Sequence, residues 1–522
     1  MLASFQLHGA APGAGQDASA AASAQVLPAG HAKTADTGRL APQQIRLLNR
    51  LTWGADEASA RRLARIGPDA FIAEQLEPGP ATLPSQVQAA IDAMQVSAVP
   101  IVDTVMSLQQ QRAAVNAAPD EASRLELRRV MNERVLLLSR EMRQRSLLRM
   151  IHSPRQLQEK MTWFWANHFH VEAENQSAIL PLMVDYEENA IRPHALGKFR
   201  DLLAATVYHP AMLLYLDNYE NREGRRNENY ARELLELHTL GADGGHQQPD
   251  VEALSRVLTG LGVNLAGEPA ELARGMEASY VRRGVFEFNP SRHDNDAKRL
   301  LGHDIAGDGL AEVDKVIDML ASHPSTARHI SRKLAVYFVS DDPPDDLISR
   351  LSQVFQDSGG DVRATLAALF ADEAFEQSLE ADSFKDPMQH VLGAMRLIYG
   401  SGDPIVNAQP VANWLSAMGQ GLYKRATPEG YPIERQAWQN SRQLLVRFDV
   451  ARTMAGTAPE LFHPFHESGE PPKRAAPDFA RPLYDGLLHN ALAAATRKAL
   501  ERADSPHEWN MLLLASPDFN SR

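Results

Sequence analysis

Apolar side chains recur at helical spacing along almost the whole chain beyond Leu40, and this recurrence limits the possible folds more than any other feature of the sequence. Apolar residues at positions i, i+3, i+4 and i+7 are typical of amphipathic helices. The sequence therefore predicts a mainly α protein. The patterns lie at 42–51, just before Gly67, and at 68–76, 120–152, 154–169, 180–191, 199–208, 228–240, 250–261, 312–320, 327–338, 347–355, 362–370, 388–399, 443–454, 482–500 and 507–515.

The pattern at 120–152 alternates leucines with arginines and predicts one long amphipathic helix with a solvated, partly salt-bridged face. An anion-binding surface is the alternative interpretation of its arginines. A strand is expected at Gly284–Phe288, with Arg299–Leu301 as its partner, so that a small β-hairpin is inserted into the large multi-helix domain. The segment Gln409–Gln439 contains several prolines and is expected to be a loop. No repeat of about 20 to 50 residues indicates a solenoid.

Three parts are expected along the chain. Residues 1–38 form a leader rich in Ala, Gly and Ser, which is expected to be disordered. Residues 39–382 form the main helical domain, and residues 383–522 a C-terminal helical lobe packed on it. Within the leader, Ala20–Gln25 is similar to the end of a signal peptide, although no basic or continuous apolar segment precedes it. A disordered leader and the remnant of an export signal are both open.

Composition excludes several kinds of function. Lys and Arg number 53 against 66 Asp and Glu, so the net charge is −13, which argues against a general nucleic-acid binder. The chain has 0 cysteines and thus no disulfide, no thiolate nucleophile and no Cys-ligated metal. Its apolar stretches are too short for a membrane span of roughly 20 residues. Phosphate-loop and Gly-x-Ser-x-Gly patterns are also missing from the sequence.

The densest group of polar side chains lies in Arg226–Gly241. Asn227 suits a helix N-cap and Gly241 the position after the helix end. On a helix of 100° per residue, five polar side chains share an arc of about 140°; this polar wedge consists of Glu228, Asn229, Arg232, Glu233 and Glu236. It is interpreted either as a solvated ladder of i,i+4 ion pairs or as an inward face with Glu233 and Glu236 as metal ligands or acid/base groups. We expect the wedge to face inward.

Two histidines are further candidates. His168 shares the apolar face of its helix with Trp165, either as an ordinary core histidine or as the polar tip of a pocket with an aromatic wall. His293 precedes Asp294 in a loop, where such a pair binds metal, transfers protons or forms an Asx turn.

The chain resembles the bacterial proteins known as the domain of unknown function 1800 family. The resemblance extends from about Leu48 to the end of the chain, and the Asn227–Gly241 segment is its most specific part. The matching segments are Leu48–Gly54, Trp163–Phe169, Ala190–Gly197, His209–Met212, Leu216–Asn218, Asn227–Gly241, Thr259–Gly260, His293–Asp294 with Lys298, His323–Pro324, Arg332–Leu334, Thr427–Pro432 and Ser516–Pro517. The resemblance implies a protein that is often exported and encoded beside another secreted protein, and it transfers no established catalytic residues. A periplasmic or extracellular location is expected, and a cytoplasmic one is left open.

Two classes of function follow. The first is a metal-dependent hydrolase or oxidoreductase that uses Mn, Fe or Zn. Its catalytic residues would be Glu233, Glu236, Arg232 and His168, its metal ligands Glu233, Glu236, His168 and His293, and its binding residues Asn227, Glu228, Asn229, Trp165 and Asp294. The second class is a non-catalytic assembly or export partner of another secreted protein, in which the polar wedge is a structural ion-pair network.

Overall fold

A computed structural model of the protein describes residues 39–77, 79–173, 177–266, 268–270, 272, 274–400, 402–456, 458–465, 470–471 and 480–522. The expectation for residues 1–38 falls outside these ranges. Residues 38–522 form one compact unit. The division of this unit at residue 383 stays a prediction.

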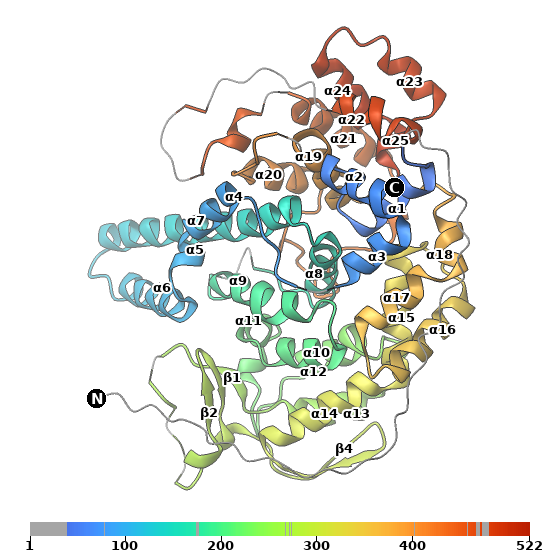
Figure 1. The fold of residues 1–522 in the computed structure, drawn as a ribbon. Coiled ribbons are helices and arrows are strands. Elements are labelled where there is room, and N and C mark those ends of the chain that lie inside the picture. The colour runs from blue at the N-terminus through green and yellow to red at the C-terminus, as the bar shows by residue number, and fades with distance from the viewer. Residues whose placement is uncertain are drawn as a thin grey trace, which may run out of the picture. The chain divides into compact units, whose positions relative to one another are not determined.

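Helices make up most of this unit, which confirms the mainly α class (Figure 1). The α-helices are α1 Pro42–Leu51, α2 Glu57–Ile66, α3 Pro68–Leu76, α4 Ser85–Asp92, α5 Gln95–Ala98, α6 Ile101–Asn116, α7 Glu121–His152, α8 Gln156–His168, α9 Met183–Asp185, α10 Phe199–Val207, α11 Pro210–Tyr215, α12 Asn229–Glu233, α13 Gln248–Val257, α14 Leu310–Ser322, α15 Pro324–Phe338, α16 Asp345–Asp357, α17 Val362–Phe370, α18 Glu373–Ser378, α19 Pro387–Tyr399, α20 Gln409–Ala417, α21 Ser441–Met454, α22 Ala480–Gly486, α23 Ala494–Leu500, α24 Pro506–Ala515 and α25 Pro517–Asn520. Two π-helical segments are η2 Tyr186–Ile191 and η5 Leu234–His238. The 3₁₀ turns are η1 Leu180–Leu182, η3 Arg192–His194, η4 Asn218–Glu220, η6 Glu277–Ser279, η7 Pro290–Arg292, η8 Arg435–Trp438, η9 Pro459–Phe462 and η10 His489–Ala491.

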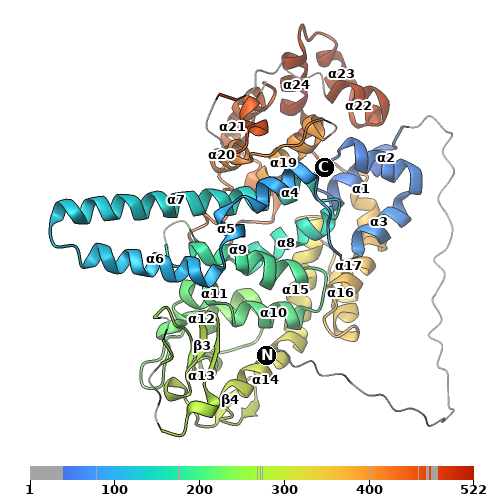
Figure 2. The same cartoon turned by 60° about the vertical axis from the view of Figure 1, so that its left-hand side comes forward.

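Helix α7 begins where the sequence indicates, because the Asp120 carboxylate accepts a hydrogen bond from the Ser123 N–H at 2.8 Å. Its first half pairs with α6 in an antiparallel arm that projects from the compact unit (Figure 2). Four apolar side chains of α7 are exposed on this arm: Leu125, Leu127, Val130 and Leu136. None of the helices in the described ranges is both long enough and apolar enough to cross a membrane.

Strands β3 (Phe286–Phe288) and β4 (Lys298–Leu300) lie where the sequence predicts strands, but the predicted pairing between them is wrong, and three further strands were not predicted. Strand β3 pairs antiparallel with β1 (Leu261–Val263) and β2 (Val281–Arg283). Strand β4 instead forms a separate hairpin with β5 (His303–Ile305). Leu301 and Gly302 both have positive φ, as the tight turn of such a hairpin requires, so β4 finds its partner locally.

Three helix predictions are corrected as well. Helix α13 ends at Val257, and residues 258–260, expected to continue it, form a turn with φ +81° at Gly260 before β1 begins at Leu261. The predicted loop 409–439 contains α20, because Pro410 occupies the first helical turn, which tolerates proline. The single helix expected at 482–500 is divided into α22, η10 and α23.

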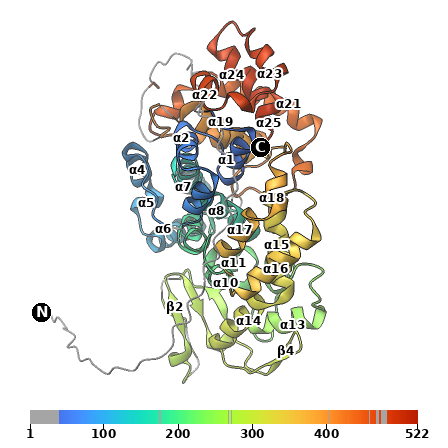
Figure 3. The ribbon, with the colours of Figure 1, turned by 45° about the vertical axis from the view of Figure 1, so that its right-hand side comes forward.

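The first and last elements of the compact unit lie side by side (Figure 3). The Leu40 N–H donates to the Leu487 carbonyl at 3.0 Å, and Asn490 Nδ2 donates to the Leu40 carbonyl at 3.0 Å. Helix α8 lies in the interior, where every residue from Gln156 to His168 except Gln158 is buried. The other elements thus surround α8, and the two ends of the compact unit are in contact.

Candidate functional site

The polar wedge lies at the surface and does not turn into the interior as expected. Arg232 lies 3.4 Å from Glu228 and 3.5 Å from Glu236, and the three side chains are 40%, 37% and 31% exposed. Gln248 accepts from Arg232 and donates to Glu228, each at 2.9 Å. Helix α12 widens into the π-helical η5 at Leu234, so the 100° wheel no longer describes the positions that follow.

The two asparagines of this segment hold the turn that precedes α12. The Asn227 side chain accepts from the Asn229 N–H at 3.0 Å and donates to the Asp217 carbonyl at 3.3 Å. Asn229 Nδ2 lies 3.4 Å from the Leu216 carbonyl. Both amides therefore have structural partners.

Glu233 stands apart from the ion-pair ladder. Burial raises the pKa of its carboxyl group, and the charges of Glu236 and Glu429 raise it further. Glu429 belongs to the loop that follows α20 and lines the cleft described below.

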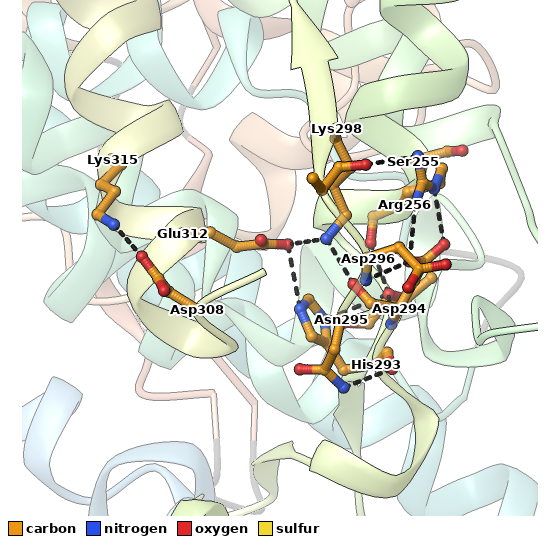
Figure 4. A network of polar contacts seen from close by, with 12 residues as sticks. Ser255, Arg256, His293, Asp294, Asn295, Asp296, Lys298, Asp308, Glu312 and Lys315 are labelled. Atoms are coloured by element: carbon orange, nitrogen blue, oxygen red, sulfur yellow. Dashed lines mark hydrogen bonds and ion pairs between the residues drawn. The ribbon is translucent and has the colours of Figure 1, made fainter. Parts of the chain in front are cut away.

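His293 and Asp294 lie in a buried polar cluster beside β4 (Figure 4). His293 Nε2 and Lys298 Nζ lie 3.0 and 2.7 Å from the same Glu312 oxygen, and all three side chains are fully buried. Asp294 receives the two-pronged hydrogen bond of Arg256 at 2.7 and 2.9 Å, which lowers the pKa of its carboxyl group. These contacts join the β insertion to α13 and α14.

The four expected metal ligands thus belong to three separate groups of contacts: the ladder at Glu236 with Glu233 beside it, the neighbourhood of His168, and the Glu312 cluster of His293. In the part of the chain that the structure describes, no three His, Asp or Glu side chains are arranged to hold a metal ion.

His168 lies at the end of α8 and is held from two sides. Its Nε2–H donates to the His238 carbonyl at 3.1 Å, so its Nδ1 accepts from Lys333 Nζ at 2.8 Å. Burial, followed by the charge of Lys333, lowers the pKa of His168 well below 6.5. The imidazole is therefore neutral and fixed in one tautomer. Trp165, predicted as an aromatic wall, is buried and donates from Nε1 to the Ala195 carbonyl at 2.9 Å.

Two more histidines surround this pair. The ring centres of His238 and His329 lie 6.0 and 6.1 Å from that of His168. Burial lowers the pKa of His238 to about 3 and that of His329 to about 4, with Lys333 acting in the same direction. Lys333 therefore faces neutral imidazoles.

The Lys333 side chain lines a cleft of about 880 Å³ between α15, the turn after η5 and the loop 425–434. Burial lowers the pKa of Lys333 to about 8, and the nearby Glu434 acts in the opposite direction. The exposed Arg332 also lines the cleft, and its guanidinium has no hydrogen bond or ion pair with the described residues. A cleft that holds a group with a shifted pKa is a candidate active site.

The loop 425–434 is fixed against the end of α8. The Asn167 side chain accepts from the Tyr431 N–H at 2.7 Å and donates to the Tyr431 carbonyl at 2.8 Å. Gly430, at φ +73°, lies so close that a Cβ there would be 2.3 Å from the Asn167 carbonyl oxygen. This close approach requires glycine and sets the position of the loop.

Sequence reasoning found His168 but missed Lys333, His329 and Arg332. His329 and Lys333 lie one turn apart on α15, where they look like ordinary polar residues of an amphipathic helix. The sequence did contain one signal for the cleft, because several of the segments that carry the family resemblance meet there. Residues of four such segments line the cleft: Asn167, Leu240 with Gly241, Arg332 with Lys333, and Glu429 to Pro432.

The comparisons with known proteins agree with that resemblance. A family model described as "Protein of unknown function (DUF1800)" matches residues 46–521. No curated protein and no solved structure matches the chain. Because the match covers nearly all of the compact unit, the chain belongs to the DUF1800 family.

Proposed function

We propose that the cleft is an active site in which Lys333 transfers protons to and from an anionic substrate. The observation that carries this proposal is the 2.8 Å contact between Lys333 Nζ and the neutral His168, in the wall of an open cleft. The enzyme hypothesis is thereby kept, but it rests on Lys333 and no longer on a metal ion held by Glu233 and Glu236.

The chemistry follows from the bonds of the amine. With a pKa of about 8, about a tenth of the Lys333 side chains are neutral at pH 7, so the group serves as base and as acid near neutral pH. One position on Nζ is bonded to His168, and the described residues bond none of the others. His168 is therefore a positioning residue that holds the amine while the amine faces the cleft.

The charges around the cleft favour an anionic substrate. Arg332 presents a guanidinium without a partner among the described residues, whereas Arg425 is paired with Glu429 at 3.1 Å. An unpaired guanidinium at a cleft wall binds carboxylate or phosphate groups in a two-pronged arrangement. Arg332 would hold such a group beside the Lys333 amine.

The test is turnover of anionic metabolites in an extract, followed by mass spectrometry. We expect the wild-type protein to consume at least one anionic metabolite and Lys333→Met to leave it unchanged. Lys315→Met is the matched control, because Lys315 is exposed and pairs with Asp308 away from the cleft. If wild type and Lys333→Met give the same metabolite profile, the proposal is wrong.

A second candidate function rests on the arm of α6 and α7. Its exposed leucines and valine suit docking to another protein, in line with an assembly or export partner. If the arm docks onto a secreted partner, replacement of Leu127 and Val130 by Glu should abolish co-purification with that partner and leave metabolite turnover unchanged. Export itself is part of this proposal, and cell fractionation tests it.

A further inference from the structure

A second, more enclosed pocket of about 280 Å³ lies between α1, α19 and the C-terminal helices. Its lining shares no residue with the cleft at Lys333. Polar groups, among them Arg522, make up the larger part of its lining, and apolar side chains such as Leu488 and Phe519 make up the rest. Lys385 reaches the pocket from the segment before α19. Its size suits a small organic molecule.

Lys385 is a buried cation with no anion beside it. The residue is 3% exposed, and its Nζ lies 4.0 Å from the ring centre of Phe519. Its ammonium group has no hydrogen bond or ion pair with the described residues. Burial, followed by the charges of Arg447 and Arg522, lowers its pKa to about 7. An unpaired buried charge destabilises the folded protein unless a partner supplies the opposite charge.

The carboxylates near the pocket already have other partners. Asp382 pairs with Arg46 at 2.9 Å, and Asp518 accepts from the Ala493 N–H at 2.9 Å. Asp386, next in sequence to Lys385, caps α19 by accepting from the Gln389 N–H at 2.7 Å. None of these carboxylates bonds to the Lys385 ammonium group, so a ligand carboxylate has room to pair with it.

We propose that this pocket binds a small organic carboxylate, whose carboxylate group pairs with Lys385 and whose apolar body packs between Leu488 and Phe519. Leu488 and Phe519 line the pocket beside Lys385 and offer the body of such a ligand apolar contacts that a bare inorganic anion does not make. This inference does not depend on the function proposed for the cleft.

The test uses benzoate as the probe with the full-length protein, in ligand-observed saturation-transfer NMR titrations at millimolar concentrations. We expect benzoate to bind, and its neutral isostere benzamide and inorganic phosphate to bind far more weakly. Lys385→Met should weaken benzoate binding roughly thirtyfold or more, as the loss of a buried charge partner does. Lys498→Met, the same change at an exposed lysine of α23, should leave binding unchanged.

A second variant, at a pocket residue other than Lys385, tests the binding site without changing the lysine. Ala491→Phe would fill the pocket from η10 and should abolish benzoate binding while Lys385 is intact. Circular dichroism checks that each variant is folded. Equal binding by wild type and Lys385→Met, equal binding of benzoate and benzamide, or binding of phosphate alone would each overturn the proposal, and so would the absence of benzoate binding.

Discussion

Burial lowers the pKa of the Lys333 amine, the hydrogen bond to His168 favours its ammonium form, and both effects are measurable. Its pKa should lie near 8, as read from the pH dependence of acetic anhydride labelling followed by peptide mass spectrometry. His168→Phe removes the acceptor of the 2.8 Å hydrogen bond, which favours the ammonium form, so the midpoint should fall further. Exposed Lys498 serves as the internal reference. A Lys333 midpoint equal to that of Lys498 would contradict the assignment.

A single glycine fixes the cleft wall. Gly430→Ala should destabilise the protein by about 1–3 kcal/mol beyond the cost of positive φ, because the new methyl group meets the Asn167 backbone at 2.3 Å. Gly419→Ala is the matched control, since φ is +82° there and nothing lies within 4 Å. Urea denaturation gives the free energy of unfolding of both variants. The difference between their losses of stability measures the clash, because both share the backbone strain. Equal losses of stability would show that the loop moves aside without cost.

Lys385→Met should raise the melting temperature, because it removes an unpaired buried ammonium. The folded pKa of about 7 lies below the ordinary 10.5. Below pH 7, Lys385 is protonated in both the folded and the unfolded protein, and the full cost of burying its charge lowers the stability. Between pH 7 and 10.5, Lys385 binds a proton only in the unfolded chain, so the free energy of unfolding rises with pH. Arg447 and Arg522 face this group, and burial keeps the pKa of nearby His390 well below 6.5.

Melting curves of wild type and Lys385→Met from pH 6 to pH 9 measure this effect. The advantage of the variant should be greatest at pH 6 and should shrink as the pH rises. An advantage that is constant over this range would mean that Lys385 does not titrate as its surroundings require.

At the scale of elements, the β insertion depends on the buried cluster around Glu312. Glu312→Leu leaves the Lys298 ammonium buried without its carboxylate, and should cost about 3–5 kcal/mol in chemical denaturation. Lys315→Met breaks an exposed pair with Asp308 in the same region and should cost less than about 1 kcal/mol (Figure 4). If the two variants lose equal stability, the buried cluster contributes no more than a surface pair.

Elements with strong local signals could be predicted from the sequence. Helix α7 has an N-cap at Asp120 and a long leucine and arginine pattern, so its existence and start follow from neighbouring residues. The pairing of β3 with β1 depends on residues about 25 positions apart, and helical spacing carries no information about it. Helix α20 was missed because Pro410 ends a helix in most positions but begins one here.

In the candidate site, too, local patterns could be predicted from the sequence, and contacts between distant residues could not. His168 stands out because a polar residue on an apolar helix face is unusual, whereas no local pattern singles out Lys333 until the fold brings it to His168. Their 165-residue separation in sequence leaves no local pattern that joins them. Conversely, the polar wedge of α12 was conspicuous because of its local spacing, and it forms a partly exposed ladder.

For the whole molecule, the boundary of the compact unit at residue 38 leads to a prediction about the leader. A chain that starts at Arg39 retains the hydrogen bond from Leu40 to Leu487, and residues 1–38 are rich in Ala, Gly and Ser, which bury little apolar surface. Its melting temperature should stay within about 2–4 °C of the full-length value, which corresponds to a loss of no more than about 1 kcal/mol. A larger fall in differential scanning calorimetry would show that the leader stabilises the unit.

The contact between α1 and the segment around Leu487 also sets an order of events during synthesis. Ribosomes add about 5–20 residues per second, so tens of seconds separate the emergence of α1 from that of its last neighbours. During this interval, the surface of α1 that packs on η10 has no native partner. The pocket beside Lys385 can form only when translation has passed α25. A carboxylate bound there would therefore recognise finished chains alone and would distinguish them from every nascent precursor.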